Sequence, residues 1–431
     1  MSENMEILGE HIIIKKGKIP IKLSDEKSDN FIYPYVDIKA FEKGSIARYT
    51  DGVKCLICED NDILIVWDGA RCGYVGKAIN GAVGSTLAII KSKENFDKDF
   101  LFYFLKSNFN YFNTKVKGIG IPHLDPFIVH HSRLIIPPLP EQHRIVAKIE
   151  ALFSSLDKGI ESLKTAQQQL KVYRQAVLKW AFEGKLTNEN VKDGELPEGW
   201  KWVKIGDISH KVTVGYVGPM KEQYIEFGVP FLRGQNVRPN KYDSNHLKYI
   251  SNDFNELLSK SKIYPGDVLV VRSGNVGISC VVPEILSEAN CADLVIIKKT
   301  LNTNSYYISY YLNSVIQSRI LAQKVGVALE HFNTKTVERF EIPFPKIEEQ
   351  HAIVSEIESR LSVCDKLEES ITYSLKQAEA LRQSVLKKAF SGKLVPQDPN
   401  DAPASVLLER IKAEKEKNMP DKKVKLKKVK N

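Results

Sequence analysis

The sequence predicts two α/β (α+β) domains joined by two long α-helices that pair as an antiparallel coiled coil, in a pseudo-twofold internal repeat. The first observation behind this prediction is a duplicated segment. Residues 142–186 and 350–394 align without a gap, since 350 − 142 and 394 − 186 both equal 208. Roughly half of the aligned positions are identical, against ~5–10% for unrelated helices of average composition. A repeat of this length exceeds a solenoid unit and indicates a duplicated domain with its helix.

The second observation is that the segments before the two copies share their order of elements. WVKIGDI parallels MEILGEH, VPFLRGQNV parallels YPYVDIKAF, and GDVLVVRSGNVG parallels NDILIVWDGARCG. NCADLVII parallels GSTLAII, and EIPFPKIEEQ parallels LIIPPLPEQ. These segments share spacing but little identity, whereas the helices share both. The chain therefore reads as two variable heads on a nearly constant helical frame.

The third observation is the seven-residue spacing of apolar side chains in both copies, which is typical of helices that pair over several heptads. In the first copy this row is Ile149, Leu156, Leu163, Leu170 and Val177. In the second copy it is Ile357, Cys364, Ile371, Ala378 and Val385.

Taken in order, residues 1–138 form the first head. Runs rich in β-branched and aromatic residues predict strands over Phe31–Phe41, Asp62–Gly69 and Thr86–Ile90. Apolar residues at helical spacing predict a helix over Asp97–Asn113. Prolines then end the last strand, and a long helix is expected from Glu141 to about Phe182, with Gly184 as its stop.

The remaining boundaries follow from the repeat. We assign 139–187 to the first helical region, 188–199 to a polar linker, 200–345 to the second head, and 346–395 to the second helical region. Residues 396–431 form an amphipathic segment with a lysine-rich tail.

An antiparallel arrangement follows from connectivity. A helix of ~40 residues is about 60 Å long, and an isolated helix with such a stripe needs a partner. If the first helix carries the chain to the second head, the second helix pairs with it fully only by running back. Two heads separated by such a rod could engage DNA half-sites in successive major grooves, about 34–36 Å apart.

Bulk composition is that of a globular protein of more than one domain. At 431 residues the chain exceeds the size of a single hydrophobic core. No apolar run approaches the ~20 residues of a membrane span, and the acidic, polar start MSENMEILGE has no signal-peptide pattern. We therefore expect a cytoplasmic protein, with its six scattered cysteines reduced.

The net charge of +9 does not by itself indicate nucleic-acid binding. From Arg410 to Asn431 one arginine and nine lysines face three acidic residues, so this tail carries +7 of the +9. The rest of the chain is nearly neutral, and any DNA-binding surface must be a local patch. The tail itself is expected to be a solvated segment, with a non-specific DNA or subunit contact as the alternative.

At the level of whole motifs the chain resembles the specificity (S) subunit of type I restriction–modification systems. The resemblance is carried by the helix starts PPLPEQHRIVAKIEALF and PFPKIEEQHAIVSEIES and the helix ends RQAVLKWAFEGKL and RQSVLKKAFSGKL. LPEGWKWVKIGDI before the second head and KLVPQDPNDAPASVLLERIKAEK after the second helix extend it. The first head departs from the pattern, because it starts at MEILGE without an LPEGW-like opening.

This resemblance implies a function. The heads would be target recognition domains, each reading one half of an interrupted site in double-stranded DNA. The paired helices would set the spacing and dock two methyltransferase (M) subunits, through which restriction (R) subunits join. The chain itself would carry no cofactor. S-adenosylmethionine, ATP and Mg would belong to the partner subunits.

Enzymatic motifs are missing from the sequence. We find no G-x-x-x-x-G-K-[ST] loop, no G-x-G-x-x-G after a strand, and no Asn-Pro-Pro-aromatic or Asp-Pro-Pro-aromatic motif. Cys55 and Cys58 form a lone C-x-x-C in a strand-like run, so no metal site is expected. The sequence therefore predicts no catalytic residues and a non-enzymatic subunit.

Candidate DNA-binding residues lie in polar loops at strand ends, where such side chains reach base edges or phosphates. The first head offers Arg71, Lys77, Ser85 and Thr86. The second offers Arg233, Gln235, Asn236, Arg272, Ser273, Asn275, Asn333 and Lys335. The alternative is that any of them is an ordinary turn or surface residue.

Candidate subunit-docking residues lie at equivalent positions in the two helical copies. They are His143, Arg174 and Gln175 in the first copy and His351, Arg382 and Gln383 in the second. For the histidines the alternative is a helix cap or packing contact.

Two rival functions remain open at this point. One is a coiled-coil scaffold with two protein-binding heads and no nucleic acid. The other is a self-sufficient methyltransferase, which the missing cofactor motif disfavours.

Overall fold

The computed structural model describes residues 5–93, 96–118, 120–188, 191–299, 302–323 and 333–401, together with residues 406, 409 and 413. The predicted amphipathic segment and basic tail therefore lie almost entirely outside the described residues. The chain divides into two units, each with one head and parts of both long helices. Unit 1 comprises 1–162 and 374–431, and unit 2 comprises 163–373.

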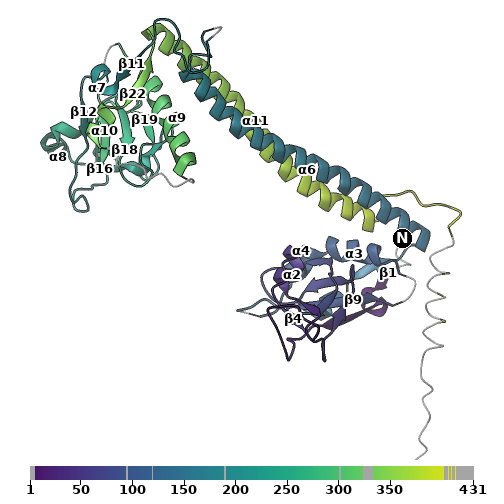
Figure 1. Cartoon of the computed structure of the whole chain (residues 1–431). Helices are drawn as coiled ribbons and strands as arrows, with labels where there is room; N and C mark the ends of the chain where they lie inside the picture. The colour runs from purple at the N-terminus through teal and green to yellow at the C-terminus, as the bar shows by residue number, and fades with distance from the viewer. Residues whose placement is uncertain are drawn as a thin grey trace, which may run out of the picture. The chain divides into compact units, whose positions relative to one another are not determined.

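The first head is a mixed α/β domain (Figure 1). Its strands are β1 (Met5–Ile7), β2 (Ile12–Lys16), β3 (Tyr33–Val36), β4 (Tyr49–Thr50), β5 (Ile57–Cys58), β6 (Ile63–Val66), β7 (Val75–Lys77), β8 (Gly81–Val83), β9 (Leu87–Ser92) and β10 (Arg133–Ile135). Its helices are α1 (Leu8–His11), α2 (Ile38–Lys43), α3 (Lys98–Ser107), α4 (Phe109–Thr114) and α5 (Pro126–His130).

The second head is built in the same way. Its strands are β11 (Lys201–Lys204), β12 (Val212–Val214), β13 (Val229–Leu232), β14 (Val237–Arg238), β15 (Lys241–Tyr242), β16 (Lys248–Ile250), β17 (Lys262–Ile263), β18 (Val268–Val271), β19 (Ser279–Val281), β20 (Ala289–Cys291), β21 (Leu294–Ile297) and β22 (Glu341–Phe344). Its α-helices are α7 (Ile205–Ile208), α8 (Asn252–Leu257), α9 (Ser305–Gln323) and α10 (Thr334–Glu338). In Figure 1, α9 lies alongside β18 and β19.

Sheet topology confirms the internal repeat. The first head contains four-stranded sheets of order β2-β9-β6-β7 and β4-β3-β8-β5, and the second contains β12-β21-β18-β19 and β16-β13-β20-β17. In each head the central strands of the second sheet pair in parallel, β3 with β8 and β13 with β20. In each head a two-stranded antiparallel ladder, β1-β10 or β11-β22, also joins the first strand to the last. The parallels drawn between the two sequences therefore correspond strand for strand.

Two local predictions for the first head were wrong. The run Phe31–Phe41 is β3 followed by α2, because the Asp37 carboxylate accepts a hydrogen bond from Ala40 N (2.8 Å) and caps a helix there. The helix over 97–113 is divided into α3 and α4 at Asn108, whose side chain donates to the Phe104 carbonyl (2.9 Å). Capping by short polar side chains thus decided both places.

The central strands of both heads are apolar on both faces. All four residues of β6 (ILIV) and of β18 (VLVV) are buried. Helices or the second sheet cover each side, so continuous runs of branched side chains replace the alternation of a half-exposed strand. This burial anchors the loops that leave the strand ends.

The two long helices are α6 (Leu139–Phe182) and α11 (Ile347–Phe390), each of 44 residues. Gly184 and Gly392 follow them with φ of 75° and 70°, so a left-handed residue ends each helix, as predicted for Gly184. The first residues of the two helices, and likewise their last residues, are 208 positions apart, as in the sequence repeat.

Within each unit the start of one long helix packs against the end of the other. In unit 1 the contact comprises Ile145, Ile149 and Phe153 of α6 with Val385, Leu386 and Ala389 of α11. In unit 2 it comprises Ile353, Val354 and Ile357 of α11 with Val177, Leu178 and Ala181 of α6. Starts meet ends in both units, so the helices run antiparallel, which confirms the predicted pairing.

Two ion pairs fix the register of this contact. Arg174 of α6 donates to Asp365 of α11 (2.6 Å) in unit 2, and Arg382 of α11 pairs with Asp157 of α6 in unit 1. Arg382 also lies over the ring of Phe153 (4.9 Å). Arg174 and Arg382 occupy equivalent positions of the repeat, as do Asp157 and Asp365. The two copies of the helix therefore pair with each other through equivalent side chains.

No helix among the described residues has the length and apolar character needed to cross a membrane.

The helix contact supports a stability prediction. Ile357 is fully buried, and Ile357→Ala should lower the free energy of unfolding by about 2–5 kcal/mol, because it leaves a cavity between the helices. Val363, on the same helix but 55% exposed, is the matched control, and Val363→Ala should cost less than about 0.5 kcal/mol. Denaturant unfolding of the full chain measures both. Equal losses from the two variants would contradict the described packing.

Candidate nucleic-acid interface

In the second head the fold gathers polar residues at neighbouring strand ends. The Ala292 amide donates to the carbonyl of Leu232 (2.9 Å), so the end of β13 lies beside the turn between β20 and β21. Arg272 and Ser273 follow β18 and bind Asp293 of that turn at 3.2 and 2.7 Å. Edge 2 is defined here as Arg233, Arg272, Ser273 and Asp293.

Asp293 is held for this contact by its backbone. Its φ of 48° lies in the left-handed region, which aspartate adopts more readily than most non-glycine residues. The amide of Asp293 donates to the carbonyl of Tyr216 (3.1 Å), which secures the turn to the end of β12. The side chains of edge 2 therefore stand on a fixed backbone while staying partly exposed.

Arg233 is oriented by a second set of contacts. Its Nη2 donates to the His246 carbonyl (2.6 Å), and its guanidinium lies over the ring of Tyr224 (5.7 Å). Gln235 donates to the same carbonyl (3.3 Å). Asn236 is fully buried, and its amide donates to the carbonyls of Asp243 and Asn245, so its side chain holds the turn from inside.

The first head has an edge at the corresponding strands β6 and β9, to which β2 adds a residue. The Gly17 amide donates to the carbonyl of Leu87 (2.9 Å) at the start of β9, the strand beside β2 in the sheet. The Gly215 amide donates in the same way to the carbonyl of Leu294 (2.8 Å) at the start of β21, the strand beside β12. The ends of β2 and β12 therefore correspond. In the first head this position carries Lys16, whose Nζ donates to Asp68 (2.8 Å). Edge 1 is defined here as Lys16, Trp67, Asp68, Ser85, Thr86 and His123.

His123 completes edge 1 from a distant part of the chain. Its Nδ1 donates to the other carboxylate oxygen of Asp68 (2.6 Å), and its side chain is half exposed. Lys16 also lies over the Trp67 ring (5.7 Å). Neither Lys16 nor His123 was among the sequence candidates, since nothing in the local pattern places a loop histidine beside the end of β6.

The charge of Asp68 is stabilised by this arrangement. Partial burial alone would raise the pKa of Asp68, but the bonds from Lys16 and His123 outweigh burial, and the net pKa is lowered. The carboxylate thus stays ionised and holds two cationic or polar groups at the edge.

The other sequence candidates are distributed more widely. Arg71 pairs with Glu42 (2.8 Å) and lies over Tyr74, and Lys77 pairs with Asp99 (2.8 Å). Asn275 is exposed in the loop after β18, and Lys335 is exposed on α10. Asn333 caps α10 by accepting from Thr336 N (2.9 Å). Their contacts with DNA stay predictions.

The docking candidates fall into three kinds. Arg174 and Arg382 bind across the helix pair. Gln175 and Gln383 are exposed on α6 and α11. His143 and His351 lie where each head meets its helix, beside Asp97 (3.3 Å) and Asn304 (3.0 Å). A docking role for these residues stays a prediction.

The cysteines form no candidate metal centre within the described residues. All six are free thiols. Cys58 bonds to the carbonyls of Ile79 and Gly81, and burial together with nearby Asp62 raises its pKa to about 11. Its thiol is therefore a packed structural group.

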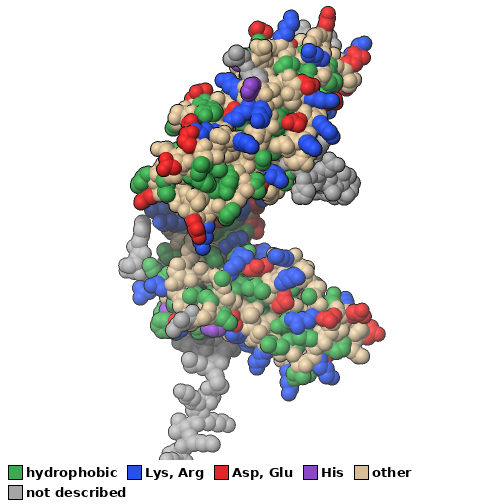
Figure 2. Space-filling view, turned by 90° about the vertical axis from the view of Figure 1, so that its left-hand side faces the viewer, with side chains coloured by type: hydrophobic (Ala, Val, Ile, Leu, Met, Phe, Trp, Pro, Cys, Tyr) green, Lys and Arg blue, Asp and Glu red, His purple; other side chains and the backbone are tan. Residues whose placement is uncertain are grey.

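Charge on the heads is mixed. On the face drawn in Figure 2, Lys and Arg side chains are interspersed with Asp and Glu over each head. This agrees with the nearly neutral body of the chain, and it leaves any recognition to small groups of oriented side chains.

Fold and edges together define a class: a duplicated recognition protein in which two α/β heads present polar strand-end clusters from an antiparallel helix pair. The model of the type I restriction modification DNA specificity domain matches residues 5–171 and 197–377. The chain therefore belongs to this family and is a specificity subunit with two recognition domains.

Relatives named as specificity subunits agree with this assignment. The chain is 28% identical over 410 residues to the type I restriction enzyme EcoBI specificity subunit of Escherichia coli, covering 89% of this chain and 86% of that one. It is 26% identical over 400 residues to the MjaVIII specificity subunit of Methanocaldococcus jannaschii, covering 90% and 92%.

Among solved structures, the HsdS subunit of Thermoanaerobacter tengcongensis shares the fold with a TM-score of 0.60 at 20% identity, covering 91% of this chain and 98% of that one. A chain from a study of complex assembly in the type I R-M system has a TM-score of 0.69 at 22% identity, covering 90% and 97%.

The Asp68 cluster gives a pH prediction. Because its folded pKa lies below the ordinary 3.8, its stabilisation is complete above that pH and is lost as pH falls through 3.8 towards the folded pKa. Asp68→Asn should therefore lower stability near neutral pH by about 1 kcal/mol, and the difference from the natural chain should shrink below pH 3.8. Unfolding at a series of pH values measures this. A difference that is constant with pH would contradict the ionised cluster.

Proposed function

We propose that the chain reads a bipartite site in double-stranded DNA, with edge 1 contacting one half-site and edge 2 the other. The observation that carries the proposal is the repeated construction of the two edges. Corresponding strand ends present different side chains in the two heads: Trp67 and Asp68 after β6 against Arg272 and Ser273 after β18, and Thr86 before β9 against Asp293 before β21. Each edge adds residues of its own, Lys16 and His123 in edge 1 and Arg233 in edge 2. Two heads of the same fold that carry different polar side chains at these strand ends suit two different short DNA sequences.

The side chains of edge 2 fit base recognition by their chemistry. An arginine guanidinium binds guanine O6 and N7 with two parallel hydrogen bonds. Arg272 is held by Asp293 yet 38% exposed, so it is oriented before DNA arrives. Asn236 has its amide engaged inside the protein, and we remove it from the set proposed to touch bases.

The helix pair is proposed to dock two methyltransferase subunits. In unit 2 it carries exposed apolar side chains that its own packing leaves uncovered, at 38–65% exposure: Val172, Tyr173, Trp180, Val363, Leu367 and Tyr373. Such side chains beside exposed Gln175 have the mixed character of a protein interface.

The chemistry is proposed to reside in the partner subunits. S-adenosylmethionine would be bound by the methyltransferases, which would flip an adenine from each half-site. ATP and Mg would be bound by the restriction subunits, which join through the methyltransferases. The chain contributes recognition and spacing, and membership of the specificity family disfavours the scaffold without nucleic acid.

A pair of substitutions tests the assignment of edges. In the reconstituted complex, Arg272→Ala should weaken binding about tenfold or more, since a good base contact contributes ~1–3 kcal/mol. The loss should vanish on duplexes whose second half-site is scrambled. Lys16→Ala should behave in the same way for the first half-site.

Lys158→Ala is the matched control, because it removes one positive charge from an exposed position on α6. Competition binding at fixed salt measures all three variants. If all three weaken binding equally on every duplex, the arginine and lysine contribute only net charge, and the edge assignment is wrong.

The spacing role makes a separate prediction. Since Asp157 faces Arg382, the position after Ser162 faces the gap between Lys376 and Gln377. Seven residues inserted at both places preserve the apolar stripe and lengthen the frame by about 10 Å. Methylome sequencing should then find the same half-sites separated by about three more base pairs. An unchanged gap would contradict the proposal that the helices set the distance.

A further inference from the structure

One buried glutamine joins each head to its helix, and the two copies have the same geometry. In unit 1, Gln142 Oε1 accepts from the Asp97 amide (2.9 Å), and Nε2 donates to the Pro137 carbonyl (2.9 Å). In unit 2, Gln350 Oε1 accepts from the Asn304 amide (2.9 Å), and Nε2 donates to the Pro345 carbonyl (3.0 Å). Both side chains are fully buried. We call each set of three residues a glutamine bridge.

The bridge acts on the residue that immediately precedes the head helix. Asp97 caps α3 by accepting from Phe100 N (2.7 Å), and Asn304 accepts from Tyr306 N (2.9 Å) at the start of α9. The proline carbonyl at the other end belongs to the chain leaving the last strand of the head. Each glutamine therefore ties two separate parts of its head to the first turn of a long helix.

Beyond the bridge, the same head helix contacts the other long helix. Phe100 and Phe104 of α3 pack edge-on against Phe390 at the end of α11 (5.2 and 5.4 Å). Tyr307 and Tyr311 of α9 pack in the same way on Phe182 at the end of α6 (5.3 and 5.0 Å). Each head is thus held at two points, by the start of one helix and the end of the other.

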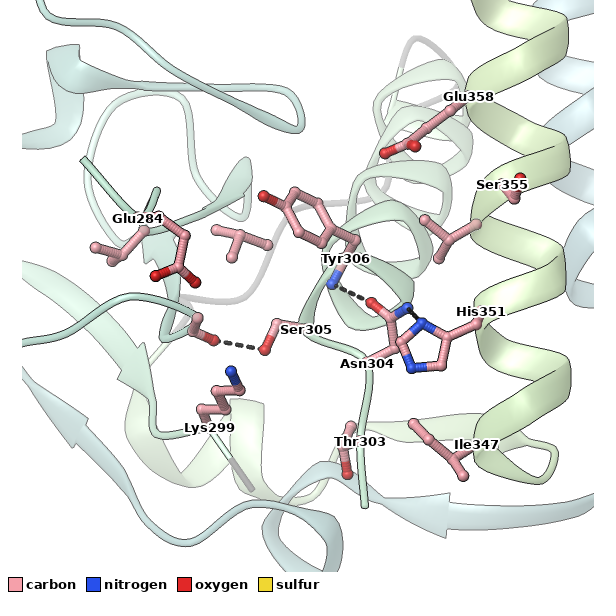
Figure 3. Close-up of a pocket in the computed structure, with 14 residues that line it drawn as sticks. Glu284, Lys299, Thr303, Asn304, Ser305, Tyr306, Ile347, His351, Ser355 and Glu358 are labelled. Carbon is pink, nitrogen blue, oxygen red and sulfur yellow. Dashed lines mark hydrogen bonds between the residues drawn. The ribbon is translucent and has the colours of Figure 1, made fainter. Parts of the chain in front are cut away.

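Figure 3 shows the surroundings of the bridge in unit 2. Asn304 donates to His351 Nδ1 (3.0 Å) at the edge of a cleft of about 760 Å³, into which Tyr306, Lys299 and Glu358 also project. In unit 1 the equivalent histidine, His143, meets a carboxylate, Asp97 (3.3 Å). The bridges agree in their hydrogen bonds but differ in the charge beside them.

We propose that Gln142 and Gln350 are positioning residues that fix the orientation of each head on its helix, and so restrict the spacer length between the two half-sites. The inference rests on the proposed reading of a bipartite site. A head free to pivot at this joint would place its edge over a range of base pairs.

A glutamine suits this task because its amide places an acceptor oxygen and a donor NH2 group in a single plane. Loss of the amide leaves a buried N–H and a buried carbonyl without partners, and such groups are costly. The aromatic contact at the other helix then holds the head at one point instead of two.

The test uses the complete complex with its methyltransferase subunits. Gln350→Leu removes both hydrogen bonds at nearly constant volume. Methylome sequencing should find both half-site sequences unchanged, with methylation at sites whose spacer is one base pair longer or shorter increased on the order of tenfold relative to the natural spacer. Gln142→Leu should give the same relaxation, because the bridges are equivalent.

Two further variants separate positioning from folding. Gln350→Met also removes both hydrogen bonds but keeps an unbranched side chain of similar length, so it should relax the spacer to the same extent as Gln350→Leu. Asp97→Asn gives unit 1 the neutral cap of unit 2 and should leave the spacer unchanged. Thermal unfolding of each chain is measured in parallel.

Unchanged spacer tolerance in Gln350→Leu and Gln350→Met would overturn the inference, as would a loss of methylation that only follows the melting temperature across the variants. An altered half-site sequence would also overturn it, because it would make the glutamine part of the reading edge. If the natural complex itself methylates no bipartite site, the proposed function fails; if it does and only the variants disagree, the bridge alone fails.

Discussion

The contact of the duplicated helix with its own copy is the constraint on which the rest of the molecule depends. Arg174 meets Asp365, and the equivalent Arg382 meets Asp157, so one set of side chains is used twice in opposite directions. This is the logic of a symmetric dimer interface placed within one chain. Around these pairs the buried row of Ile149, Ile357 and their neighbours provides most of the stabilisation, since exposed or half-exposed ion pairs contribute little. Both copies make the same contacts, so the same side chains suit equivalent positions of the two helices, which explains why the helices agree with each other while the heads do not.

The same constraint decides where the heads can be held. Because the start of each long helix packs against the end of the other, each head contacts the first turn of one helix and the last turn of the other. The glutamine bridges use the first, and the aromatic contacts on Phe390 and Phe182 use the second. Trp67 and Arg272 follow β6 and β18, which are buried on both faces, so the backbone at these strand ends is fixed while the side chains vary. Specificity can therefore change at Lys16, His123, Arg233 or Arg272 without disturbing the frame.

Much of this frame could be predicted from the sequence, because heptad spacing and a constant offset are properties of the chain itself. The helix bounds, Gly184 as a stop and the strand-by-strand parallel between the heads belong to this part. The edges were harder, since they depend on contacts between distant segments. His123 meets Asp68 from 55 residues away, and Asn236 looks like a polar loop residue until the fold buries it. Gln142 and Gln350 were visible as identical positions, but their partners arise only from the packing of α3 and α9 on the long helices.

The central claim is that both heads recognise DNA and attach to the helix pair through equivalent contacts, so that either head can replace the other. It is tested most directly by replacing residues 202–345 of the second head with a copy of residues 5–137 of the first head, and sequencing the methylome of cells that also express the methyltransferase subunit. Because the two attachment sites on the antiparallel helices are equivalent, we expect an inverted repeat of the original first half-site, with the natural spacer length. Retention of the original second half-site, or two half-sites in the same orientation, would contradict the account.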